Sequence, residues 1–364
     1  MRAIDPTRFP FPRPELLTPI PEHGSPDYAE LERLGLSPDE IADFSVNVNP
    51  YGPSLLVWEA IRRTPVDRYP DREALALRRA LAGRLACAPE QVVVGNGVTE
   101  LLWAIALAFV RRGDRAFIVG PAFGEYRRAV SLMGGQVIEW VARPEDEFAV
   151  PQALADTLRQ VQPHLAFICN PNNPTGVLLP CEMLCEWARA IPQTLFVVDE
   201  AYITFAREAR SVATLTENIL VLRSMTKDYA LAGLRLGYAV GSRVVIEALG
   251  RAIAPWNVNA LAQAAGLAAL ADEEHVRRAL ARLAQDKEAL VQGLRDLGWN
   301  PLPSAAQFFL VEVGDGAAWR RELLRRKILV RDCASFGLPA YVSLSTRQSE
   351  ENARLLVAMR EMLS

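Results

Sequence analysis

The sequence predicts an α/β protein: a large domain with a mostly parallel, seven-stranded sheet, followed by a smaller α+β domain. Two observations predict this class. Seven short apolar runs between residues 92 and 240 alternate with amphipathic stretches of helical length, which is typical of a parallel sheet covered on both faces. The pattern changes after Trp256, where alanine-rich helical stretches precede shorter strand-like runs.

The elements of the large domain are expected in a regular order. Each strand-like run is short and apolar, and each stretch between most of them is long enough for a crossover helix. Strands are predicted at residues 92–94, 116–119, 136–141, 165–169, 195–198, 219–222 and 238–240. Helices are predicted at residues 101–112, 125–133, 151–161 and 180–190.

The last hundred residues predict the smaller domain. Long helices are expected within residues 257–298, strands at 308–313, 328–330 and 341–345, and helices at 317–326 and 349–364. The proline-rich start has no core of its own, so we expect it to pack on the small domain or across a partner chain. The predicted units are an arm (1–44), a large domain (45–255) and a small domain (256–364).

Bulk composition narrows the class of protein. The chain has 40 basic and 43 acidic side chains among 364 residues, a balance that gives no reason to expect a nucleic-acid or membrane-surface partner. Neither a signal peptide nor a run long enough to span a membrane is visible, so we expect a cytoplasmic protein. Five scattered cysteines indicate reduced thiols, and with three histidines they predict no metal site.

Lys227 stands out because only three of the 40 basic residues are lysines. Lysine, unlike arginine, can lose its proton when it is desolvated or placed beside other cations. Ser224 and Arg235 lie close by in "RSMTKDYALAGLRLG", after a predicted strand. A hydroxyl, an amine and a guanidinium that converge at a strand end predict a phosphate site with a nucleophile beside it.

A second loop compatible with phosphate is "GNGVTE", residues 95–100. Its glycines permit close approach of the backbone, and the helix that starts near Thr99 offers free N–H groups to an anion. A plain turn between strand and helix would read the same way.

Two polar motifs complete the predicted site. In "NPNNPTG", residues 170–176, prolines fix the loop and asparagine amides can point inward; a rigid turn is the alternative. In "VVDEAY", Asp199 should lie at the carboxyl edge of the sheet, with Tyr202 three residues later. A buried carboxylate there needs a cationic partner, unless Asp199 simply caps a helix.

Together these pieces fit an aromatic nitrogen heterocycle with a phosphate tail, which describes pyridoxal 5′-phosphate. Asp199 would hold a protonated ring nitrogen, and Lys227 would form an imine with an aldehyde. The remaining contacts would come from Asn173 and Tyr202 to a ring oxygen, and from the Gly97 loop, Ser224 and Arg235 to the phosphate.

From about residue 22 to the end, the sequence resembles fold-type I, aminotransferase-like pyridoxal phosphate enzymes, in the branch that holds histidinol-phosphate aminotransferase and threonine-phosphate decarboxylase. The motifs "NPNNPTG", "DEAY" and "SMTKDYALAGLRLGY" carry the resemblance. It implies that Lys227 is the Schiff-base lysine and general acid/base, and that Asp199 pairs with the pyridinium. It also implies a homodimer with shared active sites.

The resemblance assigns further cofactor contacts. Phe123, in "PAFGEY", would stack on the cofactor ring, and Tyr69, in "RYPD", would reach the cofactor phosphate of the neighbouring subunit. The contacts with the phosphate in the same subunit would come from Val98, Thr99, Ser224 and Arg235.

Several segments look similar to the decarboxylase of this branch. They are "HGS" at residues 23–25, where His-Gly-Gly is usual, "LGLSPDEIADFSVNVNPYG", "APWNVNALAQAAG" and "ILVRDCASFGL". The aminotransferase shares parts of these. The implied reaction is decarboxylation of L-threonine O-3-phosphate to (R)-1-amino-2-propanol O-2-phosphate, which is used in the nucleotide loop of cobalamin.

By this resemblance His23, Asn47 and Arg331 would bind the substrate phosphate and Arg347 its carboxylate. Without it, His23 could be an ordinary loop histidine, and the two arginines could be ordinary ion-pair partners. Two other functions stay open: an aminotransferase that uses histidinol phosphate and 2-oxoglutarate, and a non-catalytic binding protein on the same scaffold.

Overall fold

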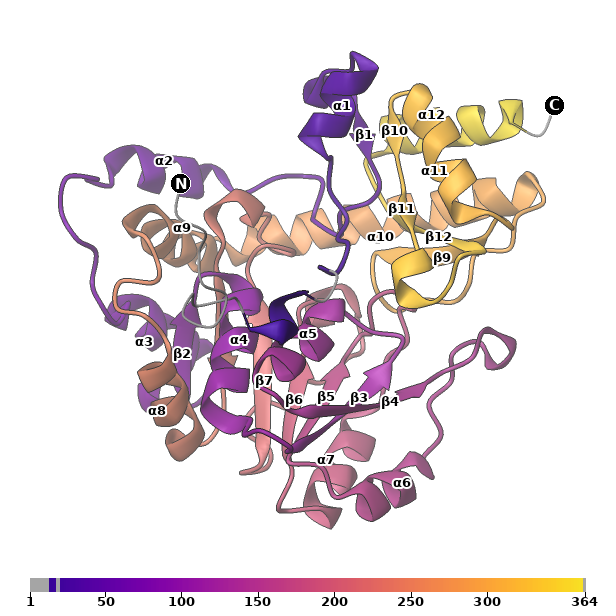
Figure 1. Ribbon diagram of the computed structural model, residues 1–364. Coiled ribbons are helices and arrows are strands. Elements are labelled where there is room, and N and C mark those ends of the chain that lie inside the picture. Colours follow the sequence, from indigo (N-terminus) through magenta and orange to yellow (C-terminus); the bar gives the residue numbers. More distant parts are fainter. Residues whose placement is uncertain (1–12, 18–19, 363–364) are drawn as a thin grey trace, which may run out of the picture.

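The structure, a computed structural model, describes residues 13–17 and 20–362 and is organised around one large sheet (Figure 1). Its seven strands lie in the order β2-β8-β7-β6-β5-β3-β4, and only β8 runs antiparallel to its neighbours. The strands are β2 (Val92–Gly95), β3 (Arg115–Gly120), β4 (Gln136–Val141), β5 (Leu165–Cys169), β6 (Leu195–Asp199), β7 (Ile219–Ser224) and β8 (Gly237–Val240). The predicted α/β class and the mostly parallel, seven-stranded sheet are confirmed.

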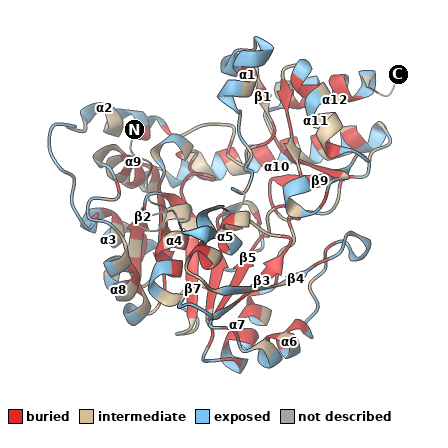
Figure 2. Ribbon diagram, in the orientation of Figure 1, coloured by how far each residue is buried: buried red, intermediate tan, exposed pale blue. Residues whose placement is uncertain are grey.

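Helices cover both faces of this sheet, which explains why the central strands are apolar along their length. Phe196 and Val198 of β6 face a cluster with α6 (Leu154–Val161) and α7 (Cys181–Ala190). Val197 faces a cluster with α4 (Gly97–Phe109), α5 (Gly124–Leu132) and α8 (Arg243–Ala252). Figure 2 shows the central strands buried and the outer helix faces exposed. The other α-helices of this part are α2 (Leu55–Arg63), α3 (Leu75–Arg84) and α9 (Ala260–Ala271).

The chain after α9 forms a second, three-stranded antiparallel sheet. It contains β11 (Arg331–Asp332), β12 (Tyr341–Ser345) and β9 (Phe308–Glu312), in that order. Three helices accompany it: α10 (Glu273–Asp296), α11 (Gly316–Arg325) and α12 (Ser349–Glu361). Leu290 and Leu294 of α10 share a buried cluster with Leu355 of α12, so these helices pack on one another.

Residues 28–43 of the N-terminal segment lie against this second unit (Figure 1). The short helix Pro14–Leu17 instead lies on Gly124–Leu132 of the large domain, so the expectation that the start packs on the small domain holds only for the later residues. Strand β1 (Ala42–Asp43) pairs in parallel with β10 (Ile328–Leu329), and Leu31 of α1 (Tyr28–Leu34) packs on Leu324 and Leu329. The arm predicted for residues 1–44 includes residues 1–12 and 18–19, which lie outside the described residues. No helix of the described chain is long and apolar enough to cross a membrane.

Candidate active site

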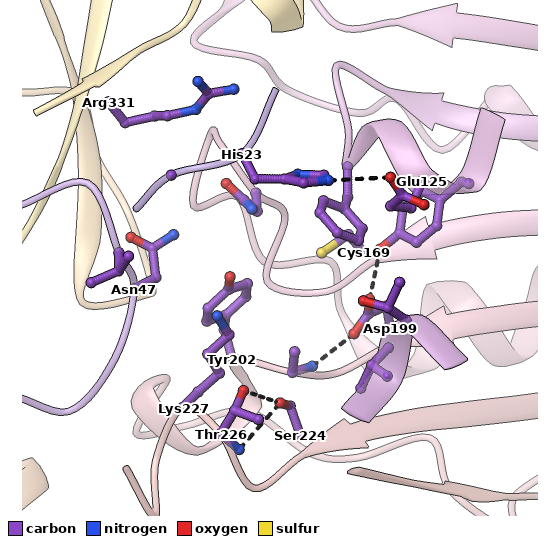
Figure 3. Close-up of a pocket in the computed structure, with 18 of the residues that line it drawn as sticks. His23, Asn47, Glu125, Cys169, Asp199, Tyr202, Ser224, Thr226, Lys227 and Arg331 are labelled. Atoms are coloured by element: carbon purple, nitrogen blue, oxygen red, sulfur yellow. Dashed lines mark hydrogen bonds and ion pairs between the residues drawn. The ribbon is translucent and has the colours of Figure 1, made fainter. Parts of the chain in front are cut away.

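A cavity of about 520 Å³ lies at the carboxyl ends of β5, β6 and β7 (Figure 3). Asp199 is the last residue of β6 and Ser224 the last of β7, so neighbouring parallel strands bring them to the same edge. Arg331 reaches the cavity from the second sheet and His23 from the N-terminal segment. Twelve of the predicted site residues line it: His23, Asn47, Val98, Thr99, Phe123, Asn173, Asp199, Tyr202, Ser224, Lys227, Arg235 and Arg331.

Lys227 follows β7, lines the cavity and is half-buried. Burial, reinforced by the cationic Arg235 and opposed by Asp199, lowers the pKa of Lys227 from 10.5 to about 8. Its ammonium nitrogen lies 5.7 Å from the centroid of the Tyr202 ring. A substantial fraction of this amine is therefore neutral near physiological pH, which is the state a nucleophilic lysine needs.

Asp199 is buried, 5% exposed, and is held from two sides. Tyr126 donates its hydroxyl hydrogen to Oδ2 at 2.8 Å, and the backbone N–H of Ala201 donates to Oδ1 at 3.0 Å. Burial raises the pKa of Asp199, while Tyr126, Ala201 and Lys227 act in the opposite direction. A fixed, buried carboxylate of this kind suits a cationic N–H group placed opposite it.

One end of the cavity is surrounded by hydrogen-bond donors of the Gly97 loop, Ser224, Thr226 and Arg235, which we call the Gly97 cradle. Gly97 has φ of 79°, and a Cβ added there would lie 2.7 Å from Nη2 of Arg235, so a side chain would fill the space. Val98 and Thr99 follow in the first turn of the 13-residue helix α4. The hydroxyls of Ser224 and Thr226 lie 2.7 Å apart. A helix N-terminus, two hydroxyls and a guanidinium form a site for a phosphate.

The opposite end of the cavity carries His23 and Arg331. Nε2 of His23 lies 3.1 Å from Oε1 of Glu125, and its ring centroid lies 5.1 Å from that of Phe123. Arg331 donates from Nη2 to the Glu22 carbonyl at 2.8 Å. An imidazole and a guanidinium therefore lie at the end of the cavity away from Ser224 (Figure 3).

Three predicted residues do not line the cavity. Gly97 is not among the lining residues, although Val98 and Thr99, which follow it, are. Tyr69 is 79% exposed and packs on Trp256 with 4.8 Å between ring centroids. Arg347 pairs with Glu351 one helical turn away, at 3.1 Å. The roles of Tyr69 across a dimer and of Arg347 at a carboxylate stay predictions.

Several cavity residues were missed from the sequence: Trp103, Glu125, Tyr126, Arg128, Cys169 and Thr226. Glu125 and Tyr126 stand within "PAFGEY", where only Phe123 was singled out. Nothing in the sequence distinguishes Glu125 from the other 42 acidic residues, because its burial results from α5 packing beside the cavity.

The sequence pattern of the family "Aminotransferase class I and II" matches residues 39–359. The chain belongs to this family. A histidinol-phosphate aminotransferase of Thiobacillus denitrificans is 36% identical over 347 residues, which cover 92% of this chain and 89% of the relative. The predicted family is thus confirmed.

Two solved structures are informative neighbours. The histidinol-phosphate aminotransferase of Sinorhizobium meliloti, in complex with pyridoxal-5′-phosphate, superposes with a TM-score of 0.86, 26% identity and 98% of each chain covered. The L-threonine-O-3-phosphate decarboxylase of Porphyromonas gingivalis superposes with a TM-score of 0.78 and 27% identity, covering 88% of this chain and 98% of that one. Both belong to the branch named by the resemblance, and the cofactor is pyridoxal 5′-phosphate, as predicted.

The residues present fit this cofactor. The Gly97 cradle leaves room for its phosphate, and Asp199 offers a buried carboxylate to its ring nitrogen. Lys227 supplies the amine with a lowered pKa.

Proposed function

We propose that this chain is an aminotransferase that acts on a phosphorylated amine, with histidinol phosphate as donor and 2-oxoglutarate as acceptor. The observation that carries the proposal is Lys227, a half-buried amine with a pKa of about 8 that follows β7 and lines the same cavity as Asp199, Val98 and Thr99. The choice of substrate rests on the name of the relative that is 36% identical across nearly the whole chain.

The side chains have distinct tasks in this proposal. Pyridoxal phosphate, when bound, supplies an aldehyde carbon and an electron-withdrawing ring. Asp199 holds a proton on the ring nitrogen, and Asn173 and Tyr202 bind the ring oxygen. Ser224 and Arg235 hold the phosphate. The Lys227 amine, once it is free, would take the proton from the amine-bearing carbon of the substrate and return it across the nitrogen, to the carbon that the cofactor supplies as its aldehyde.

The second candidate is decarboxylation of L-threonine O-3-phosphate, the reaction that several sequence segments, among them "HGS" and "ILVRDCASFGL", led us to expect. The specific observation in its favour is His23 of that "HGS" segment, which lies at the cavity wall beside Phe123. The two reactions differ in which bond at the substrate carbon is held perpendicular to the cofactor ring. Both use Lys227, Asp199 and a phosphate subsite.

One pair of assays separates the candidates. Cofactor-loaded protein is given histidinol phosphate with 2-oxoglutarate, and formation of glutamate is measured. In parallel, release of CO2 from L-threonine O-3-phosphate is measured without a keto acid. Glutamate formation alone supports the aminotransferase, and catalytic CO2 release alone assigns the decarboxylase. Lys227→Ala should abolish either activity, and activity in neither assay would contradict both candidates.

A further inference from the structure

Glu125 is a buried carboxylate that the proposed function does not use. It lies in the first turn of α5, is 3% exposed and borders the cavity. Desolvating a carboxylate is costly unless charged or polar partners compensate it, so its surroundings should show what it does.

Three side chains surround this carboxylate. Trp103 of α4 donates its indole N–H to Oε2 at 3.1 Å. Oε1 lies 3.1 Å from Nε2 of His23 and 3.6 Å from Nη1 of Arg128. The Arg128 guanidinium is itself held over the Trp103 ring, 5.5 Å from the centroid. Helices α4 and α5 thus fix one oxygen and direct the other towards His23 (Figure 3).

The contact with Glu125 holds the side chain of His23 in position. It lies in a segment without helix or strand, and its side chain is 43% exposed. The next residue, Gly24, packs so closely on the chain that an added Cβ would lie 2.1 Å from the Ser45 carbonyl oxygen. The backbone of the segment is therefore anchored beside Ser45, and the imidazole is anchored by Glu125 and the Phe123 ring.

The second ring nitrogen of His23, Nδ1, is available to bind an anion. Among the described residues Nδ1 of His23 makes no hydrogen bond, and the arginines Arg128 and Arg331 line the same cavity. A carboxylate that accepts from Nε2 fixes the ring orientation and the tautomer. When Nδ1 also carries a proton it can donate to an anion, and the carboxylate then balances the charge of the ring.

We propose that Glu125 is a positioning residue for recognition of the substrate phosphate: it holds His23 so that Nδ1 can donate to that phosphate, beside Arg128 and Arg331. The inference rests on the proposed function only in that the substrate carries a phosphate. It holds equally for histidinol phosphate and for L-threonine O-3-phosphate.

The first test measures binding without turnover. Cofactor-loaded protein, in which the cofactor phosphate already occupies the Gly97 cradle, is titrated with inorganic phosphate by calorimetry. Glu125→Gln and His23→Ala should each weaken binding about tenfold, the loss of one charge-assisted contact, about 1.4 kcal/mol. The double variant should bind no more weakly than His23→Ala, because the carboxylate acts through the imidazole.

The second test uses whichever phosphorylated amine the wild-type protein turns over. Glu125→Gln should raise KM for that substrate about tenfold and leave kcat within about twofold. Its KM for the counterpart without phosphate should stay unchanged. Glu182→Gln on α7, which loses an exposed pair with Arg210, is the matched control and should change none of these values.

Specific outcomes overturn the inference. Losses that add up in the double variant would make Glu125 independent of His23, and equal KM changes with and without the phosphate would make its role structural. If Glu125→Gln does not retain cofactor absorbance, Trp103→Phe removes the N–H that fixes Oε2, and unchanged phosphate binding there would count against the inference. Phosphate binding that depends on Glu125 in a protein that turns over neither substrate would refute the proposed function and leave this inference standing.

Discussion

At the scale of the residue, Lys227 shows how the cavity controls reactivity. Its pKa of about 8 means that the neutral, nucleophilic amine increases about tenfold between pH 7 and pH 9, whereas an ordinary lysine would stay charged over this range. We expect the rate at which the apoprotein captures pyridoxal phosphate to rise with a midpoint near pH 8, followed by absorbance of the bound cofactor. Lys227→Ala should capture none covalently. A midpoint near pH 10 would contradict the lowered pKa.

Tyr126 offers a second test at this scale. Its hydroxyl donates to Oδ2 of Asp199, and its ring stacks on Phe167 with 5.3 Å between centroids. Tyr126→Phe should keep the ring packing but leave Asp199 with one donor fewer, so its carboxylate form becomes less favourable. We expect kcat to fall about ten- to a hundredfold, and the free energy of unfolding to fall by only about 1–3 kcal/mol for the lost hydrogen bond. Tyr28→Phe, at a residue that is 70% exposed, is the control.

The site residues that could be predicted are those that come directly after an apolar strand in the sequence. Asp199, Lys227 and Ser224 each follow an apolar strand, so their place at the sheet edge could be inferred. Glu125 and Tyr126 could not be found this way, because their function depends on packing against Trp103 and Asp199, which are distant in sequence.

At the scale of the element, the ends of all seven strands predicted for the large sheet lie within two residues of the observed ends. Helix α4 differs more: it begins at Gly97, two residues before the start expected near Thr99 and four before the helical stretch predicted at 101–112, because the glycine loop itself forms the first helical turn. The strand predicted at residues 328–330 is also wrong in detail. It divides at Val330 into β10 and β11, which join different sheets, and pairing partners of this kind are not visible in a local pattern.

Glu200 directly follows β6 and forms an ion pair with Arg223 of β7, and its contacts allow a stability test. It is 1% exposed, accepts hydrogen bonds from Ser211 Oγ at 2.6 Å and Val212 N at 2.9 Å, and forms an ion pair with Arg223 Nε at 3.2 Å. Glu200→Ala leaves the guanidinium of Arg223, whose side chain is only 16% exposed, without this ion pair, so we expect a loss of about 3 kcal/mol in free energy of unfolding.

The comparison variant is Ser211→Ala, which removes a single hydrogen bond and should cost about 1 kcal/mol. Urea denaturation of the cofactor-free protein measures both values under the same conditions. Equal effects for the two variants would show that the ion pair with Arg223 adds nothing to the hydrogen bonds of Glu200.

At the scale of the whole molecule, the exposed apolar residues of the segment around α2 require an explanation. Leu55, Trp58, Val66 and Tyr69 are between 48% and 79% exposed, and Tyr69 packs on Trp256 outside the cavity. Exposed apolar side chains in such numbers are typical of an interface. The resemblance implies a homodimer in which Tyr69 reaches the phosphate end of the neighbouring cavity, and the exposed position of Tyr69 leaves that contact possible.

Subunit complementation tests this arrangement. Tyr69→Ala and Lys227→Ala proteins, each with low activity alone, are mixed in equal amounts, unfolded and refolded together. If Tyr69 serves the other subunit, each mixed dimer has one site with both defects and one intact site. Random pairing of dimers then returns about a quarter of wild-type activity. If Tyr69 serves its own subunit, every site carries one defect and no activity returns. The control is a mixture of Asp199→Ala with Lys227→Ala. Both residues belong to the site of their own subunit, so every site in this mixture carries one defect and the mixture should stay inactive. Recovery in the first mixture alone would establish a dimer with shared sites.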